Sequence, residues 1–375
     1  MSVTKAGLED VVVSTSDICF IDGHEGRLLY RGIDVDALAE RSTFEEVVYL
    51  LWHGALPTRK ELAEHTKVLN ATATRRLPPK LLSLLRALPK KTTPMEVLRT
   101  GVSALSAFDP DAADNSREAT ARKAVRVTAQ MPSVVAAWER IRRGKAPIAP
   151  NPKLSLAANF LYMMTGKKPT DLAAKTFDVA LILHADHEFN ASTFAARVTA
   201  ATLSDLHSAV VSAIGALKGP LHGGANEQVM LMVQQIASPA RAESWIRKAL
   251  ADKARVMGFG HRVYRVEDPR AKHLRRLASE LGGQAGNTSY VEILNTVARV
   301  VTEEKKIYPN VDLYSGAAYA SMGIPTDQFT PIFAISRVAG WAAHVLEQHG
   351  NNRLIRPRSE YTGPTRATYV PIDRR

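Results

Sequence analysis

Hydrophobic residues recur every three or four positions along most of the chain, which is the spacing of one buried face of an α-helix. Two long segments, Phe194 to Leu217 and Tyr290 to Glu304, keep this spacing without the alternation that is typical of a strand. The pattern also favours helices over residues 121–143, 154–165 and 171–184. We therefore predict an all-α fold class, in which helices form nearly all of the regular structure.

Helix start signals support this prediction. Ser42 is followed three positions later by Glu45, and Thr58 is followed in the same way by Glu61. This is the spacing of a capping box, in which two side chains satisfy backbone N–H groups at a helix N-terminus. We expect one helix to begin after Ser42 and another to run from Thr58 towards Leu69.

Only the N-terminal part of the chain carries strand signals. Residues 17–21 and 27–31 contain aliphatic and aromatic side chains, and they flank a glycine-containing turn over residues 22–26. Two such segments around a short turn are typical of a β-hairpin. We expect one small N-terminal hairpin, followed by helices.

Two stretches that contain glycine and proline, residues 215–224 and 323–331, divide the chain. The block between them has the size of a small domain. We predict a large helical domain from residues 1–221 and 330–375, and a small inserted domain from residues 222–329. A hinge at these junctions would let the domains close over substrates, although ordinary loops would have the same composition.

The composition is that of an ordinary globular protein, since 45% of the 375 residues are hydrophobic and 23% are charged. The formal net charge of +12 fits a nucleic-acid-binding protein, a cleft for anionic small substrates, or a generally basic surface. Lysine and arginine are scattered in small groups with acidic residues between them. The charge alone does not decide between these three classes.

The single cysteine, Cys19, excludes an intramolecular disulfide framework and a multi-cysteine metal site. No segment approaches the roughly 20 consecutive apolar residues that cross a bilayer. Residues 1–10 resemble neither a signal peptide nor an arginine-rich presequence. We therefore expect a cytoplasmic protein without a membrane anchor.

Three segments combine histidine with other reactive residues. In the first, His184 and His187 are three positions apart, so that they would share a helical face and could ligate a metal ion. The zinc-protease pattern needs histidines four apart with a glutamate between them, which this segment lacks. We favour a structural role for one histidine and anion binding for the other, without a metal.

In the second segment, His222 precedes Gly223 and Gly224, where the backbone can approach a ligand closely and a helix is expected to begin. A helix N-terminus would lower the pKa of the histidine. It would thus favour neutral imidazole, which can donate a hydrogen bond to a developing oxyanion. An ordinary turn histidine is the alternative.

The third segment, residues 258–270, contains His261 and three arginines. Its Gly-x-Gly sequence is only a weak phosphate-loop signal, but the density of positive charge favours an anion site over a structural basic loop. Further along the chain, Asp312 lies beside an expected helix start, where it would by itself be interpreted as a helix cap.

These segments occur in the order and spacing found in citrate synthases, and the chain resembles that family over nearly its whole length. The resemblance rests on residues 184–190, 219–227, 257–270 and 309–316, and also on Ser336-Arg337 and Arg356-Pro357. The length is similar to that of the short bacterial and archaeal form of the family.

The resemblance implies a two-domain helical fold and the condensation of acetyl-CoA with oxaloacetate and water to give citrate and CoA. It implies that Asp312 removes a methyl proton from acetyl-CoA and that His222 stabilises the resulting enolate. It also implies that His261 polarises the ketone of oxaloacetate and protonates the new alkoxide. So weakly acidic a proton can be removed only if the enolate oxygen is stabilised as it forms.

The resemblance also implies the binding residues, since guanidinium groups bind carboxylates in a bidentate way. Oxaloacetate would be held by His187, Arg270 and Arg337, with Arg356 donated by the second subunit of a homodimer. CoA would contact Arg255, Met257, Gly258, Phe259, Gly260 and Arg265. The resemblance implies no cofactor and no metal, because acetyl-CoA is a substrate. It also implies that the small domain closes against the large one.

Three alternatives stay open. A 2-methylcitrate synthase would use the same chemistry on propionyl-CoA, and one methylene in an apolar pocket changes selectivity by only ~1–3 kcal/mol. A basic nucleic-acid-binding helical protein would explain the charge, but the sequence holds no motif of that kind. A non-catalytic relative used as a scaffold is disfavoured by the presence of His222, His261 and Asp312.

Overall fold

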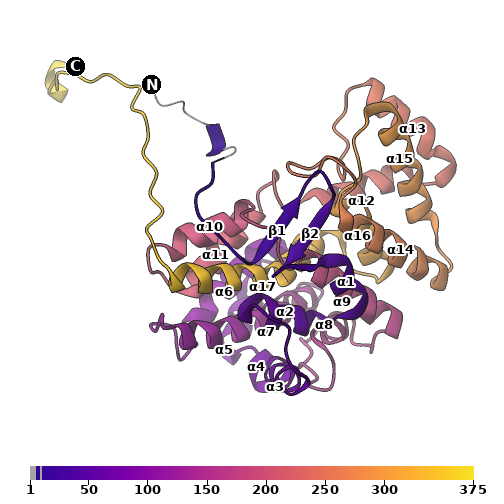
Figure 1. Cartoon of the computed structure of the whole chain (residues 1–375), viewed down its shortest axis with the longest axis horizontal. Helices are drawn as coiled ribbons and strands as arrows, with labels where there is room; N and C mark the ends of the chain where they lie inside the picture. The colour runs from indigo at the N-terminus through magenta and orange to yellow at the C-terminus, as the bar shows by residue number, and fades with distance from the viewer. Residues whose placement is uncertain (1–5, 9–10) are drawn as a thin grey trace.

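The computed structural model describes residues 6–8 and 11–375. The prediction that residues 1–10 carry no targeting signal therefore falls largely outside the described part of the chain. Helices α1 to α17 form nearly all of the regular structure, together with one small sheet (Figure 1). The predominantly helical fold class is therefore confirmed.

The expected β-hairpin is also confirmed, as part of a three-stranded antiparallel sheet. Strand β1 (Cys19–Asp22) pairs with β2 (Arg27–Tyr30), and β2 pairs with the short strand β3 (Ile33–Asp34). The register places residues 23–26 in the turn between β1 and β2. The sequence does not predict β3, because so short a strand shows no alternating pattern.

A first group of helices forms the body of the molecule, and α17 is its central helix because it packs against α2, α7, α9, α10 and α11. The short 3-10 helix η2 (Thr326–Gln328) directly precedes α17, whereas η1 (Ala6–Leu8) and η3 (Ile372–Arg374) lie towards the two ends of the chain, away from this group (Figure 1). The helices of the group are α1 (Val35–Arg41), α2 (Phe44–His53), α3 (Arg59–Asn70), α4 (Thr72–Arg75), α5 (Pro79–Ala87), α6 (Pro94–Ser106), α7 (Arg117–Arg142), α8 (Leu156–Thr165), α9 (Asp171–His184), α10 (Ala191–Ala200), α11 (Leu206–Leu217) and α17 (Phe329–Gly350).

A second group of helices is consecutive in the chain, and its members pack chiefly against one another. Figure 1 shows this group gathered on one side of the body. Its members are α12 (Ala225–Ile236), α13 (Pro239–Ala251), α14 (Pro269–Gln284), α15 (Ser289–Lys305) and α16 (Val311–Ser321). The domain boundaries placed at 222 and 329 stay a prediction.

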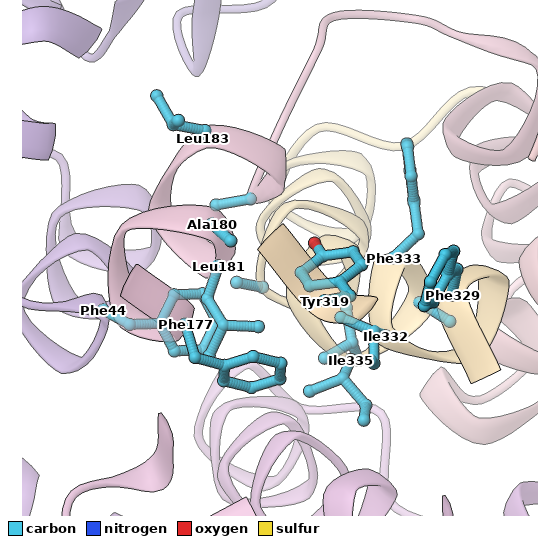
Figure 2. Close-up of a cluster of buried hydrophobic side chains, with 14 of the residues drawn as sticks. Phe44, Phe177, Ala180, Leu181, Leu183, Tyr319, Phe329, Ile332, Phe333 and Ile335 are labelled. Atoms are coloured by element: carbon cyan, nitrogen blue, oxygen red, sulfur yellow. The ribbon is translucent and has the colours of Figure 1, made fainter. Parts of the chain in front are cut away.

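The hydrophobic core joins α9, α16 and α17. Figure 2 shows Phe177 and Leu181 of α9 in one cluster with Ile332 and Ile335 of α17 and Tyr319 of α16. All five side chains are buried, and full burial of such a side chain stabilises a fold by about 1.5–3 kcal/mol. Helices α16 and α17 carry Asp312 and Arg337 of the candidate site, so this core holds those two residues in place.

The structure corrects one predicted helix. Residues 194–217 belong to two helices, α10 and α11, which pack against each other. Asp205 starts the second helix, because its side chain accepts a hydrogen bond from the backbone N–H of Ser208 at 3.1 Å. Helical spacing continues on both sides of this N-cap, which is why the sequence pattern hides the break.

The predicted helix starts are confirmed in one case and displaced by one residue in the other. The capping box of Thr58 and Glu61 is present at the start of α3. Helix α2 is capped by Thr43 and not by Ser42, since the Thr43 side chain accepts a hydrogen bond from the Glu46 N–H at 3.3 Å.

One described helical stretch, Thr326–Gly350, is long and apolar enough to cross a membrane. Its most apolar window is 94% buried inside the protein, so this stretch is the core helix α17 with its preceding turn. Beyond α17, residues 351–375 run as an extended, mostly exposed segment away from the helices (Figure 1). Arg356 lies in this exposed segment.

Candidate active site

A cavity of about 760 Å³ is lined by residues from both groups of helices. The three residues expected to be catalytic, His222, His261 and Asp312, all line it. Arg270 and Arg337 line the same cavity. Its volume is within the roughly 300–1,000 Å³ that is usual for ligand pockets. Folding therefore brings together five residues that are dispersed along the sequence.

His222 lies in the turn between α11 and α12. The residue after it, Gly223, has no space for a side chain, because a Cβ there would collide with the carbonyl oxygen of Leu217. Nε2 of His222 accepts a hydrogen bond from the backbone N–H of Ser192 at 3.3 Å and lies 2.8 Å from the Ser192 hydroxyl. A backbone N–H can only donate, so the proton of the neutral ring is on Nδ1.

The charge state of His222 follows from its surroundings. Burial, and then the positive charge of Arg337, lower the pKa of His222 to about 4. The imidazole is therefore neutral at physiological pH, as the sequence predicts. The main cause is burial, whereas the sequence predicts a helix N-terminus as the cause.

In His261 the ring nitrogen that accepts hydrogen bonds is Nδ1, whereas in His222 it is Nε2. Its Nδ1 accepts hydrogen bonds from the backbone N–H groups of Val263 at 3.0 Å and Tyr264 at 3.2 Å. The proton of the neutral ring is therefore on Nε2. Burial, with a contribution from Arg270, lowers the pKa of His261 to about 4 against the opposing effect of Asp268.

The glycine-containing loop before His261 is tied to the start of α16, where Asp312 lies. The backbone N–H of Asn310 donates to the Gly258 carbonyl, and its side-chain Nδ2 donates to the Gly260 carbonyl, both at 2.9 Å. Gly258 has a left-handed φ of 87°, and a Cβ there would lie 2.9 Å from side-chain atoms of α16 and α12. Glycine is required for this close approach.

Asp312 lies in the first turn of α16, but Asn310 is the residue that caps the helix. The Asn310 side chain accepts a hydrogen bond from the Asp312 N–H at 3.0 Å. Within the described residues, no group donates a hydrogen bond to the Asp312 carboxylate. Burial raises the pKa of Asp312 to about 6 against the opposing charge of Arg270, which makes this carboxylate a stronger base than an exposed one.

Asp268 links Arg270 to the start of α16. Its carboxylate accepts hydrogen bonds from Nε and Nη2 of Arg270 at 2.9 and 2.7 Å, and from the Val311 N–H at 3.2 Å. Both charged side chains are buried. Burial disfavours the charged form of Arg270. The attraction of the Asp268 carboxylate outweighs this effect of burial and raises the pKa of Arg270. The cavity wall thus keeps a fixed cation.

Arg337 adds a second cation from α17. Its Nε donates a hydrogen bond to the His184 carbonyl at 2.7 Å, and its guanidinium lies 4.7 Å from the centre of the Phe333 ring. Burial lowers the pKa of Arg337, and Asp186 opposes this effect. Two guanidinium groups in one cavity suit a ligand with two carboxylates.

The structure separates His184 from His187. Helix α9 ends at His184, so the two side chains do not share a helical face, and that prediction is wrong. His184 is buried and donates from Nδ1 to the Ala180 carbonyl at 2.8 Å, whereas His187 lines the cavity, with its Nε2 3.2 Å from the Tyr264 hydroxyl. Over residues 6–8 and 11–375, no group of three or more potential ligands is arranged to hold a metal ion.

The residues expected to contact CoA divide into two sets. The segment Arg255 to Gly260 lines the cavity. Arg265 is exposed and is not among the lining residues, and its backbone N–H donates to the Gly23 carbonyl at 2.7 Å. Arg356, expected to bind oxaloacetate, also lies outside this cavity. The single chain therefore does not bring these two arginines to the site.

Sequence reasoning assigned no role to Ser192, Tyr264 or Asp268, although each contacts a residue of the cavity. Ser192 is 30 positions from its partner His222 and carries no local signal. Asp268 directly precedes a proline at the first position of α14. This pattern is typical of a helix N-cap, and it could have indicated that the Asp268 side chain accepts local N–H bonds.

Comparisons with known proteins identify the family of this chain. The family model described as "Citrate synthase, C-terminal domain" matches residues 7–358. The chain belongs to the citrate synthase family. The match includes every cavity residue discussed above, and Arg356 as well.

Individual relatives match over nearly the full length. The citrate synthase of Haloferax volcanii is 51% identical over 99% of both chains. A 2-methylcitrate synthase of Mycobacterium tuberculosis is 46% identical over 96% of this chain and 90% of its own. Both activities are therefore represented among close members of the citrate synthase family.

Solved structures show the same fold. A citrate synthase from Pyrobaculum aerophilum superposes with a TM-score of 0.92 at 43% identity, over 98% of this chain and 94% of its own. A citrate synthase from Thermoplasma acidophilum, solved as a ternary complex with carboxymethyl coenzyme A and oxaloacetate, gives 0.91 at 35% identity over 98% of both chains. The fold of this chain is therefore that of citrate synthases.

Proposed function

We propose that this chain is an acyltransferase that condenses acetyl-CoA with oxaloacetate and water to give citrate and CoA. Membership of the citrate synthase family supports the reaction. The cavity supports the assignment of roles, because it collects two neutral histidines, one basic carboxylate and two arginines. The proposed reaction needs no cofactor beyond its two substrates.

In the first step, Asp312 removes a proton from the methyl group of acetyl-CoA. The raised pKa of this carboxylate, about 6, narrows the gap between the base and the very weak carbon acid. His222 donates its Nδ1–H to the thioester oxygen as negative charge develops there. A donor that is already oriented in a buried site stabilises this charge without reorganisation.

In the second step, the enolate carbon attacks the ketone carbon of oxaloacetate. His261 donates its Nε2–H to the ketone oxygen and passes the proton to the alkoxide that forms. Arg270, Arg337 and His187 hold the two carboxylates of oxaloacetate. Water then cleaves the thioester of the bound citryl-CoA, which releases the CoA thiol and citrate.

One observation carries this proposal. Backbone N–H groups donate to Nε2 of His222 and to Nδ1 of His261, which leaves each neutral ring with one N–H to donate. Two neutral donors and one free carboxylate are the groups that enolate formation and ketone activation require. A metal-dependent or nucleophilic mechanism would need a different set of groups.

The test is a thiol-release assay with oxaloacetate and acetyl-CoA, followed by identification of citrate as the product. We expect release of CoA that depends on both substrates. A purified, folded chain that releases no thiol with acetyl-CoA or propionyl-CoA would refute the proposal.

A second candidate is a 2-methylcitrate synthase, which the close relative from Mycobacterium tuberculosis favours. The chemistry would be the same, with propionyl-CoA as the acyl donor. A single extra methylene changes selectivity by only ~1–3 kcal/mol in an apolar pocket. The ratio of kcat/KM for the two acyl-CoAs decides between these candidates.

We further propose a homodimer in which Arg356 completes the oxaloacetate site of the other subunit. The exposed position of Arg356, outside the cavity of its own chain, supports this arrangement. The close packing of α12 to α16 on one another supports a small domain over residues 222–329 that closes on the larger one. The cytoplasmic location stays a prediction from the sequence.

A further inference from the structure

We infer that the turn of the N-terminal β-hairpin positions the loop that carries His261, and that Gly23 is the positioning residue. The inference rests on the proposed function, since it concerns the placement of the ketone-activating histidine. The hairpin contacts both sides of the oxaloacetate pocket, through its base on one side and its turn on the other. Figure 1 shows β1 and β2 extending from the body towards the second group of helices.

The base of the hairpin is joined to the segment that leads to His187. Tyr30 in β2 is fully buried, and its hydroxyl lies 3.1 Å from the Ile182 carbonyl and 3.0 Å from the Asp186 carbonyl. The buried side chain of Leu28, also in β2, adds apolar contact with the core. The base of the hairpin therefore has a fixed position relative to His187.

The turn of the hairpin docks on the His261 loop, backbone against backbone. The Gly23 carbonyl accepts a hydrogen bond from the Arg265 N–H at 2.7 Å. A Cβ on Gly23 would lie 2.8 Å from the carbonyl carbon of Val263 and closer still to its oxygen. The φ of Gly23 is not in the left-handed region, so glycine is needed here for space and not for backbone conformation.

The turn itself is held in shape before it meets the loop. The Asp22 carboxylate accepts hydrogen bonds from the backbone N–H groups of His24 and Glu25, both at 2.9 Å. Such an Asx-type turn limits the freedom of the backbone. Gly26 makes a second close approach, since a Cβ there would lie 2.7 Å from the Val266 side chain. The turn thus presents a defined surface to the loop.

The docked loop is also the one that orients His261. The Val263 N–H is one of the two groups that hold Nδ1 of His261, and the Tyr264 N–H is the other. The Tyr264 hydroxyl in turn lies 3.2 Å from Nε2 of His187. A displacement of Val263 therefore moves His261 directly, and a misplacement of about 1 Å can lower a rate on the order of 10²-fold.

The primary test is Gly23→Ala, measured by thiol release with wild-type enzyme alongside. We expect kcat to fall by at least ~10-fold, while KM for oxaloacetate changes by less than about 3-fold because Arg270 stays locked to Asp268. The melting temperature should stay near that of the wild type. A purely structural role for Gly23 would instead lower the melting temperature and leave kcat of the folded enzyme intact.

Gly26→Ala and Gly32→Ala form a matched pair. Both glycines have a left-handed φ, 65° and 81°, so alanine strains the backbone at either position. A Cβ on Gly26 would press on Val266, whereas nothing lies within 4 Å of a Cβ on Gly32. We expect both variants to lose stability, but only Gly26→Ala to lose kcat.

The outcomes separate two kinds of failure. Wild-type kcat in a folded Gly23→Ala enzyme would overturn the inference. Equal kcat in Gly26→Ala and Gly32→Ala would also overturn it, and this pair decides the matter if Gly23→Ala does not fold. Absence of thiol release in the wild-type chain would overturn the proposed function itself.

Discussion

The backbone N–H of Ser192 donates a hydrogen bond to Nε2 of His222, across 3.3 Å. The Ser192 hydroxyl approaches the same nitrogen at 2.8 Å and also lies 2.8 Å from Oδ1 of Asn190. It accepts a further hydrogen bond from the indole N–H of Trp341 at 3.2 Å. Ser192 therefore fixes the tautomer of His222 through its backbone and the orientation of the ring through its side chain.

Ser192→Ala should lower kcat without unfolding the protein. The variant keeps the backbone N–H, and so keeps the tautomer, but it loses the hydroxyl that orients the ring. We expect kcat to fall about 5- to 100-fold, the effect of one oriented hydrogen bond in a buried site, with KM for oxaloacetate nearly unchanged. Steady-state kinetics with both substrates varied measures this.

Ser133→Ala is the matched control for Ser192→Ala. Ser133 is also buried, and its hydroxyl donates a hydrogen bond to the Arg75 carbonyl at 2.8 Å, away from the cavity. Both variants lose one buried hydrogen bond, but Ser133→Ala should keep wild-type kcat. Equal kcat in the two variants would contradict the orienting role of Ser192.

Asp312→Asn should remove most turnover while oxaloacetate still binds. The substitution removes the proposed base but leaves the guanidinium groups of Arg270 and Arg337 in the cavity. General base catalysis contributes about 10²- to 10⁴-fold, so kcat should fall by that factor. Isothermal titration with oxaloacetate, together with thiol release, separates binding from turnover. Wild-type turnover in this variant would refute the assignment.

The pH dependence of kcat/KM should show an acid limb with a midpoint near pH 6. Asp312 must be ionised to act as a base, and its raised pKa of about 6 means that it takes up a proton as the pH falls through that value. The pKa values of His222 and His261, about 4, keep both rings neutral over the same range. A kcat/KM that stays constant between pH 8 and about pH 5 would contradict the assignment of Asp312 as the base.

Helical spacing and turn residues predict much of this fold because they depend on interactions between residues that are close together in the sequence. The helix predicted over residues 171–184 is present as α9, and its residues 176–184 are all buried, whereas the expected continuation of a helical face to His187 is absent. The break at Asp205 does not follow from the sequence, because apolar spacing continues on both sides of it. The displaced cap at Thr43 shows the same limit, since two neighbouring hydroxyl residues can both serve as caps.

The candidate site was predictable in its residue types but not in the tautomers of its histidines. The glycines around His222 and His261 indicate close backbone approach. The tautomer of His222, however, depends on Ser192, which is 30 positions away and reaches the ring only through folding. The placement of Arg265 outside the cavity depends in the same way on the hairpin turn that docks beside it. Long-range contacts of this kind leave no periodic signal in a sequence.

Asp178→Asn should stabilise the protein at neutral pH. Asp178 accepts a hydrogen bond from the Phe44 N–H at 3.2 Å, and burial, then the charge of Glu45, raise its pKa. A carboxyl group with a raised folded pKa destabilises the fold as the pH rises from its ordinary value of 3.8 through the raised one. The variant should therefore melt above the wild type at pH 8, and the difference should vanish near pH 4.

The expected gain for Asp178→Asn is at least ~1 °C at pH 8, which corresponds to roughly 1 kcal/mol for a chain of 375 residues. Asp171→Asn, at the exposed start of the same helix α9, is the control because it removes the same charge without burial. A gain that is independent of pH, or equal in both variants, would contradict the role of the buried carboxyl.

Arg356→Ala and Asp312→Asn should complement each other within one dimer. If Arg356 serves the other subunit, a mixed dimer of the two variants holds one site with both substitutions and one site with neither. Two affinity tags allow the mixed dimer to be purified, and we expect about half of the wild-type activity from its single intact site.

Each parent dimer should have low activity, because every site then carries one substitution. If Arg356 acted within its own chain, each site of the mixed dimer would be damaged, and its activity would only equal the mean of the two parents. The exposed segment 351–375, which leads away from its own cavity, favours the first result.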